Sequence, residues 1–325
     1  MTIFKNSLRA FGAALFLGTA LTAPTTAVAN SDADYQVPLS AEAMALADEL
    51  DELGFATTEV GAFYSERGYQ PLWFSDRDLM RGILVAMYRS HDHGLPSESY
   101  GAVALADLII RADTPKGRAH AEIAMSDAFL RYARHLNSGV LKPSSVDKEI
   151  HTIADVKDAN LLLGMIGSAQ DADAVVAALA PANSDYARLM AEKATLEAEI
   201  ASGGYGEAIP ANRLIRPGDN GRHIELVRAR MDALGYEVEL AGTEYDEALL
   251  VAVKQFQGDH LLSQDGVLGP ATIGRLNLSP SGRLEQILVN LERMRWLNIE
   301  RGERHIRVNI PDYSMAVIDL SLIHI

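Results

Sequence analysis

One tetrapeptide in the sequence has the spacing of a serine nucleophile. Ser145-Val146-Asp147-Lys148 matches the S-x-x-K motif of penicillin-binding enzymes, in which the lysine helps to activate the serine. The partner signatures S-D-N and K-T-G do not occur in the sequence, and the motif follows Pro143 in a predicted loop. We therefore interpret the motif as a chance match rather than a nucleophile.

A second group, His91-Asp92-His93, could in principle hold a metal ion. Residues two apart share one face only where the chain is extended, and no second ligand cluster accompanies this pair of histidines. The interpretation that we favour is a polar helix end before Gly94, where histidines complement the helix dipole. We predict no metal and no cofactor.

The acidic residues and the missing cysteines limit the chemistry further. Neighbours such as Glu244 and Asp246 could pair as glycosidase carboxylates, but among 44 acidic residues spacing alone selects no pair, and a solvated helix face explains them. The sequence has 0 cysteines, which excludes a thiolate nucleophile, disulfides and Cys-ligated zinc. The net charge of −15 argues against a nucleic-acid partner. We identify no catalytic residue.

The first residues have the pattern of an export signal. Lys5 and Arg9 precede an apolar stretch that is too short to span a bilayer, and Ala27-Val28-Ala29 gives an A-x-A cleavage site. We predict a Sec-type signal peptide at 1–29, cleavage after Ala29 and a periplasmic protein, with an uncleaved anchor as the alternative. No later segment is long and apolar enough for a membrane span, so none is expected after cleavage.

Residues 40–205 have the apolar spacing of helices, without sustained β-alternation. Leu46 and Leu50 begin the first stripe, and Gly54 is expected to stop that helix. Further helices are predicted around 79–87, 129–136, 171–179 and 185–202. We expect one all-α domain, which ends at the breaker-rich stretch that begins with Ser202.

A small three-helix bundle is predicted over residues 212–279. Its apolar stripes are Ile224, Val227, Met231 and Leu234 in the first helix, and Tyr245, Leu249, Val253 and Phe256 in the second. Thr243 with Asp246 resembles a capping box that would begin the second helix. Pro270 stands where a third helix would begin.

The pattern changes after a last predicted helix, Leu284 to Leu297. Ile306 and Val308 alternate with polar residues, which predicts a strand, and a second strand is expected at 313–318 after a Pro311-Asp312 turn. A lone hairpin cannot bury both faces, so we expect the sequence to stop inside a β-containing domain. The predicted fold class is therefore mainly α, ending in a helix and the first β-strands of an incomplete domain at 283–325.

Several motifs in the bundle point to one family of domains. They are Leu234-Gly235-Tyr236, Gln255-Phe256-Gln257, Asp265-Gly266-Val267-Leu268-Gly269-Pro270 and Thr272. On these residues the bundle resembles the peptidoglycan-binding domain of cell-wall enzymes, which implies peptidoglycan as a partner. The candidate site residues are the motif positions Gly235, Tyr236, Phe256, Gln257, Asp265, Gly266, Gly269, Pro270 and Thr272. We expect the glycines among them to serve the fold rather than to contact ligand.

The surrounding chain carries landmarks of a larger family. They are Pro71-Leu72-Trp73, His93-Gly94-Leu95-Pro96, Gly139 with Pro143, Leu291-Glu292-Arg293-Met294-Arg295-Trp296 and Val308-Asn309-Ile310-Pro311. On these residues the chain, over 40–319, resembles the large periplasmic L,D-transpeptidases. Their order is signal, helical scaffold, peptidoglycan-binding domain and catalytic domain. The resemblance implies a transferase that forms direct cross-links between peptide stems in cell-wall biogenesis and cell shape.

The chain departs from that family at its catalytic motif. The family's nucleophile is a cysteine in a His/Ser-Gly-Cys motif, helped by an upstream histidine, whereas this sequence has 0 cysteines. The residues after Leu297 are too few for a catalytic domain on the order of 100 residues. We therefore expect a fragment, truncated before the catalytic cysteine and inactive by itself. The alternatives are a non-catalytic murein-binding or scaffolding protein and a murein amidase or hydrolase, for which we find no zinc or carboxylate domain.

Two tryptophans have different predicted roles. Trp73 is expected in the core. Trp296 follows Arg293 and Arg295, and we favour a connecting helix that packs on the next domain. The alternative is that these arginines line the approach to an active site whose substrate stems carry carboxylates.

Overall fold

The computed structural model describes residues 39–298, 302, 304–309, 313–319 and 322–324. The predicted signal peptide and the predicted Pro311-Asp312 turn lie outside the described residues. In the N-terminal region the helices are α1 (Ala41–Glu52), α2 (Glu59–Glu66), α3 (Arg77–Tyr88), α4 (Ala102–Ile110), α5 (Pro115–Ser138), α6 (Pro143–Val146), α7 (Ala159–Ser168), α8 (Ala172–Leu179) and α9 (Ser184–Ala201). Two 3-10 turns, η1 (Ser90–His93) and η2 (Ser97–Tyr100), lie between α3 and α4.

The later elements follow in chain order. The bundle consists of α10 (Arg222–Ala233), α11 (Glu247–Asp259) and α12 (Pro270–Leu276), and α13 (Pro280–Trp296) comes after it. The strands are β1 (Arg304–Asn309), β2 (Ser314–Asp319) and β3 (Leu322–His324). The mainly helical fold class is thus confirmed. Among the helices of the described residues, none is long and apolar enough to cross a bilayer.

Polar side chains start most of these helices. Ser40 Oγ accepts a hydrogen bond from the backbone of Ala43 at 3.2 Å, and Asp158 Oδ1 accepts one from Leu161 at 2.8 Å. Such caps satisfy backbone N–H groups that have no partner within the helix. The predicted stop at Gly54 is confirmed, because this residue follows α1 with a positive φ of 74°.

The predicted capping box at Thr243 is wrong. The N-cap of α11 is Asp246, whose Oδ1 accepts from the backbone of Leu249 at 2.8 Å. The carbonyl of Thr243 instead accepts from the backbone of Gly221 at 2.8 Å. Because its carbonyl is engaged there and its side chain caps no helix, α11 begins only after Asp246.

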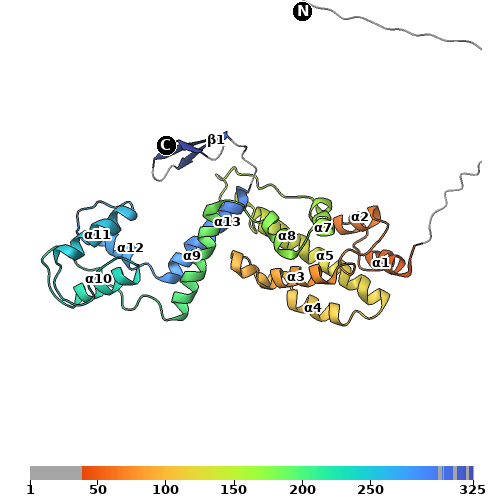
Figure 1. Cartoon of the computed structure of the whole chain (residues 1–325), viewed down its shortest axis with the longest axis horizontal. Helices are drawn as coiled ribbons and strands as arrows, with labels where there is room; N and C mark the ends of the chain where they lie inside the picture. The colour runs from red at the N-terminus through yellow and green to blue at the C-terminus, as the bar shows by residue number, and fades with distance from the viewer. Residues whose placement is uncertain (1–38, 299–301, 303, 310–312, 320–321, 325) are drawn as a thin grey trace, which may run out of the picture. The chain divides into compact units, whose positions relative to one another are not determined.

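The long helix α5 organises the N-terminal region. Helices α1, α2, α3, α4, α7 and α8 all pack against it (Figure 1). Trp73 is fully buried against this helix, as predicted, and its ring meets Phe129 edge to face at 5.3 Å between centroids. Tyr64 and Tyr132 are buried in the same core. The sequence between α2 and α3 is therefore fixed on α5 by aromatic packing.

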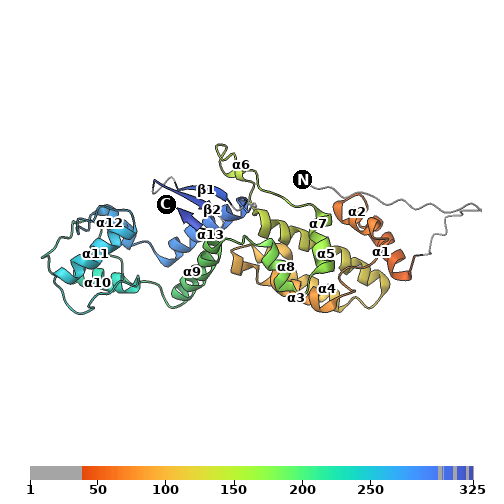
Figure 2. The ribbon, with the colours of Figure 1, turned by 45° about the horizontal axis from the view of Figure 1, so that its top comes forward.

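Helices α9 and α13 pack side by side (Figures 1 and 2). Tyr186 and Leu196 from α9 and Ile287 and Leu291 from α13 form a small buried cluster of their own. Because the bundle lies between these two helices in the sequence, the chain leaves α9, forms the bundle and returns to α9.

The bundle has its own apolar core. Val227, Met231, Leu249, Val253 and Phe256, which belong to the two predicted stripes, are all fully buried. The helices α10, α11 and α12, which supply this core, lie next to one another (Figure 1). A short antiparallel bridge between Ile215 and Leu268 joins the segment before α10 to the turn before α12.

The strands after α13 form one antiparallel sheet in the order β1-β2-β3. Ile306 pairs with Val317, and Val308 pairs with Met315, so the two predicted strands are confirmed as an antiparallel pair. The third strand was not predicted from the sequence. It pairs with the end of β2, where Val317 lies opposite His324.

Candidate functional site

Four of the candidate site residues in the bundle meet around one turn. Gln257 is almost fully buried, and its Nε2 donates to Asp265 Oδ1 at 3.0 Å and to Val267 O at 3.1 Å. Its Oε1 accepts from the backbone of Gly266 at 2.8 Å, and Thr272 Oγ1 lies 3.4 Å from its Nε2. One amide side chain from α11 thus holds the whole turn that leads into α12.

Two residues of this turn have local roles that the structure makes clear. Gly266 has a φ of 73°, and a Cβ there would lie 2.1 Å from Leu250 Cδ1, so a larger residue cannot fit without a shift. The backbone N–H of Val267 and the amide of Gln257 lower the pKa of the Asp265 carboxyl. Both observations assign these motif positions to the fold of the turn.

The other candidate residues lie away from that turn. Tyr236 packs its ring on Phe256 at 5.6 Å between centroids and donates to Asp259 Oδ2 at 3.0 Å. Gly235 ends α10 with a φ of 83°. Gly269 and Pro270 begin α12, at its N-cap and first helical position. The motif therefore maps onto core, caps and turn, and the structure does not gather its nine positions into one cleft.

A buried carboxylate that the sequence analysis missed holds the loop before α3. Glu122 is 1% exposed, and its carboxylate accepts from the backbone N–H groups of Leu72, Trp73 (2.8 Å) and Phe74 (3.2 Å). Tyr64 Oη donates to it at 2.9 Å. Burial raises the pKa of Glu122, while these hydrogen bonds oppose the rise. The sequence signal that could have identified it is the position of an acidic residue, Glu122, among the apolar residues on the buried face of α5.

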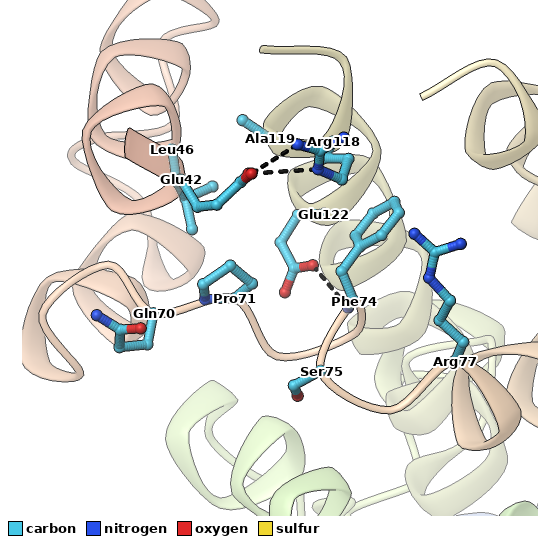
Figure 3. Close-up of a pocket in the computed structure, with 10 residues that line it drawn as sticks. All are labelled: Glu42, Leu46, Gln70, Pro71, Phe74, Ser75, Arg77, Arg118, Ala119 and Glu122. Atoms are coloured by element: carbon cyan, nitrogen blue, oxygen red, sulfur yellow. Dashed lines mark hydrogen bonds and ion pairs between the residues drawn. The ribbon is translucent and has the colours of Figure 1, made fainter. Parts of the chain in front are cut away.

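A cavity of about 330 Å³ opens beside Glu122 (Figure 3). Arg118 forms a 2.6 Å ion pair with Glu42, and Phe74 and Arg77 also line the cavity. Arg118 and both carboxylates of this cavity already have partners within the chain, and the guanidinium of Arg77 lies over the Phe74 ring. The cavity therefore offers a shaped recess rather than unpaired catalytic groups.

The two sequence motifs with possible chemistry are not assembled into catalytic sites. Ser145 Oγ donates to Lys142 O at 2.6 Å, and no described hydrogen bond joins it to Lys148. His91 pairs with Asp92 at 3.3 Å, whereas His93 Nδ1 lies 3.2 Å from Tyr186 Oη. Across the part of the chain that the structure describes, no group of three or more His, Asp or Glu side chains could hold a metal ion.

Two family models match successive parts of the chain, and each part has its own apolar core. Residues 58–192 match a model described as "Scaffold domain". Residues 220–276 match a model described as "Putative peptidoglycan binding domain". The second match supports the cell wall as a partner of the chain. We call the two matched parts the scaffold domain and the peptidoglycan-binding domain.

A short segment is also similar to one curated protein. The "Probable CtpA-like serine protease" of Staphylococcus haemolyticus is 35% identical over 72 residues, which are 22% of this chain. The chain spans only 14% of the length of that relative. The similarity shows a shared segment and not a shared activity.

The end of α13 docks on the scaffold domain through a buried arginine. Arg295 is 1% exposed, and its Nη1 donates to His93 O at 2.9 Å and to Tyr186 Oη at 3.2 Å. Its Nη2 donates to Glu292 Oε2 at 2.9 Å. The other carboxylate oxygen of Glu292 accepts from the backbone of Leu141 at 2.8 Å. One buried ion pair thus links α13 to three segments of the scaffold domain.

Trp296 packs beside this ion pair. A Cβ at Gly139, whose φ is 92°, would lie 2.7 Å from the indole, so only glycine permits this approach. Trp296 Nε1 donates to Glu292 Oε1 at 3.0 Å. The sequence analysis favoured packing of this helix on the next domain. In the structure, Trp296 and Arg295 instead contact residues of the scaffold domain.

We predict that this docking weakens in mild acid. Burial lowers the pKa of His93 from 6.5 to about 4, and the positive charges of Arg295 and Lys193 act in the same direction. The negative charge of Asp92 opposes this change. The hydroxyl oxygen of Tyr186 accepts a hydrogen bond from Arg295, which leaves its O–H free to donate to His93 Nδ1. His93 Nδ1 can accept this hydrogen bond only while the imidazole is neutral. Between pH 6.5 and 4 the unfolded chain binds more protons at this position, so the free energy of unfolding falls as the pH falls.

Urea unfolding at pH 7 and at about pH 5 checks this pH dependence. His93→Gln should show a smaller loss of stability between the two pH values than the parent chain. His135, whose pKa burial also lowers, contributes in the same direction, so part of the pH dependence should remain in His93→Gln. An unchanged pH dependence in His93→Gln would count against the assigned role.

Proposed function

We propose that the chain is the peptidoglycan-binding and scaffold portion of an L,D-transpeptidase that forms direct cross-links between peptide stems. The observation that carries this proposal is the order of the two matched parts, at 58–192 and 220–276. This order fits the architecture that the sequence landmarks also suggest. The role of the chain in the cell would then be to deliver cross-linking chemistry to the wall.

The chemistry of that family defines what this chain supplies. In the family that it resembles, a cysteine thiolate attacks the L,D-amide of a donor stem and expels the terminal D-residue. The thioester that results is captured by a side-chain amine of an acceptor stem. This sequence has 0 cysteines, so its own residues cannot form that thioester. Its contribution would be to hold murein near the reacting groups, where a second weak contact raises the apparent affinity.

The alternative is a non-catalytic murein-binding or scaffolding protein. One observation favours it: buried charged groups such as Glu122 and Arg295 are hydrogen-bonded to nearby parts of the chain and do not converge on an open cleft. Glu122 accepts from the backbone of Trp73, and Arg295 donates to the carbonyl of His93. The peptidoglycan-binding domain supports both proposals equally.

Reading the coding sequence beyond codon 325 separates these proposals. An in-frame Ser/His-Gly-Cys segment within about 200 codons, a span that could hold one further domain, would support the transferase. A genuine stop codon directly after Ile325 would support the binder. A recombinant copy of this chain that cross-links purified stem peptides would contradict both.

We further propose that the protein is exported to the periplasm. The basic, apolar and A-x-A segments of residues 1–29 support this. Sequencing the N-terminus of the protein from a periplasmic extract should give Asn30 as the first residue. An intact N-terminus in the cytoplasmic fraction would contradict the proposal.

A further inference from the structure

A long loop leaves the end of α5 and returns to it. Residues 139–157 form this loop, which carries the short helix α6 away from the other helices (Figure 2). The outgoing side is held by Leu141, whose backbone donates to Glu292 of α13 at 2.8 Å. The returning side is held by Ser138 Oγ, which donates to Asp155 O at 2.7 Å. Both ends of the loop are therefore fixed on α5 and α13.

The loop encloses a cavity of about 510 Å³. This volume is within the usual range for small-ligand sites, about 300–1,000 Å³. Its charged and titratable lining residues are Arg134, Lys142, Lys148 and His151, and no Asp or Glu belongs to the lining. Of these four, Arg134 is already paired with Glu59 at 2.7 Å. In a chain of net charge −15, a cavity with only basic groups favours an anionic ligand.

The lysines of this cavity are available to a ligand. Lys142 and Lys148 are both exposed, and neither forms an ion pair with a described residue. Elsewhere in the loop, Lys157 is neutralised by Asp155, and the exposed acids Asp147 and Glu149 on either side of Lys148 do not line the cavity. The charge that faces the cavity is thus positive, and its two unpaired carriers are Lys142 and Lys148.

The returning side of the cavity is an extended segment with free backbone N–H groups. Residues 151–157 belong to no helix or strand, and the N–H groups of 151–156 donate to no described residue. Ile153 is 89% exposed and Val156 is 60% exposed. An extended edge with open N–H groups and exposed aliphatic side chains suits a second extended peptide.

We propose that the cavity enclosed by residues 139–157 binds a peptide stem of peptidoglycan. A stem is a short extended peptide with several carboxylates and small apolar side chains. Its carboxylates would pair with Lys142 and Lys148, and its backbone would lie along the extended segment that contains Ile153. This inference rests on the proposed function, because the peptidoglycan-binding domain is what would bring stems close to the cavity.

The test measures binding of a soluble labelled tetrapeptide, L-Ala-γ-D-Glu-meso-diaminopimelate-D-Ala, to the purified chain by fluorescence polarisation. Lys142→Gln and Lys148→Gln should each weaken binding by about tenfold, since each removes one charge-assisted contact. The control is Lys116→Gln, which removes an equal charge from an exposed lysine that pairs with Glu52 outside this cavity. All three side chains are exposed, and circular dichroism confirms that each variant is folded.

A parallel assay with purified sacculi distinguishes the two proposals. If sacculi bind but the tetrapeptide does not, the cavity inference is wrong and the proposed function stands. If the tetrapeptide binds and the sacculi do not, the cavity inference stands and the proposed function fails. Equal binding by all variants, or equally tight binding of an all-L acidic peptide of the same charge, would overturn the cavity inference.

Discussion

Glu122→Ala should lower the free energy of unfolding of the scaffold domain by about 3–5 kcal/mol. The substitution leaves the buried N–H groups of Leu72 and Trp73 without an acceptor and removes a partner of Tyr64. Each buried polar group left unpaired costs about 1–3 kcal/mol. The loop that these groups anchor carries Trp73, so its aromatic packing would loosen as well.

Tryptophan fluorescence during urea unfolding measures this loss. The chain has 2 tryptophans, and both Trp73 and Trp296 are buried outside the bundle, so the signal reports the scaffold domain and the docked end of α13. The matched control is Glu122→Gln, which keeps one acceptor oxygen and should cost about 1–2 kcal/mol. A loss below about 1 kcal/mol in Glu122→Ala would mean that the carboxylate does not support the loop.

Arg295→Met should destabilise the docking of α13 by about 3–5 kcal/mol. Removal of the guanidinium leaves Glu292, whose side chain is 12% exposed, as a largely buried charge without its partner. It also leaves the carbonyl of His93 without its donor. Breaking one side of a buried ion pair costs more than the pair contributes, because the remaining charge stays desolvated.

A second substitution tests that explanation. Glu292→Gln combined with Arg295→Met removes the unpaired charge but keeps an oxygen that can accept from Leu141 and Trp296. The double variant should therefore recover at least half of the stability lost in Arg295→Met, measured by the same fluorescence. If the double variant were less stable than Arg295→Met, an unpaired carboxylate could not be the cause of the loss.

Local patterns predicted much of the fold. The stripe that contains Leu249 and Phe256 lies in the bundle core, and the glycine stop at Gly54 ends α1. These signals are local because a helix repeats its buried face every three or four residues. Thr243 shows the limit: its backbone pairs with Gly221, and local spacing does not contain that partner.

The long-range polar contacts could not be predicted in this way. Glu122 meets Trp73 at a separation of 49 residues, and Arg295 meets His93 at a separation of 202 residues. Nothing in the spacing of α13 indicates that it returns to α9 after the bundle. The peptidoglycan-binding motif predicted the local structure but not the ligand-binding face. Gln257 and Gly266 stabilise the turn in which they lie, and this role does not show which face of the bundle meets the ligand.

Co-sedimentation with purified sacculi tests most directly the central claim that the peptidoglycan-binding domain attaches this chain to murein. The parent chain should pellet with sacculi and stay in solution without them. Phe256→Ala opens the bundle core and should abolish pelleting, whereas the matched change Phe129→Ala, in the scaffold core, should leave pelleting intact. Each change removes a fully buried ring, worth about 3–5 kcal/mol. A parent chain that remains in the supernatant, or equal pelleting of both variants, would contradict the claim.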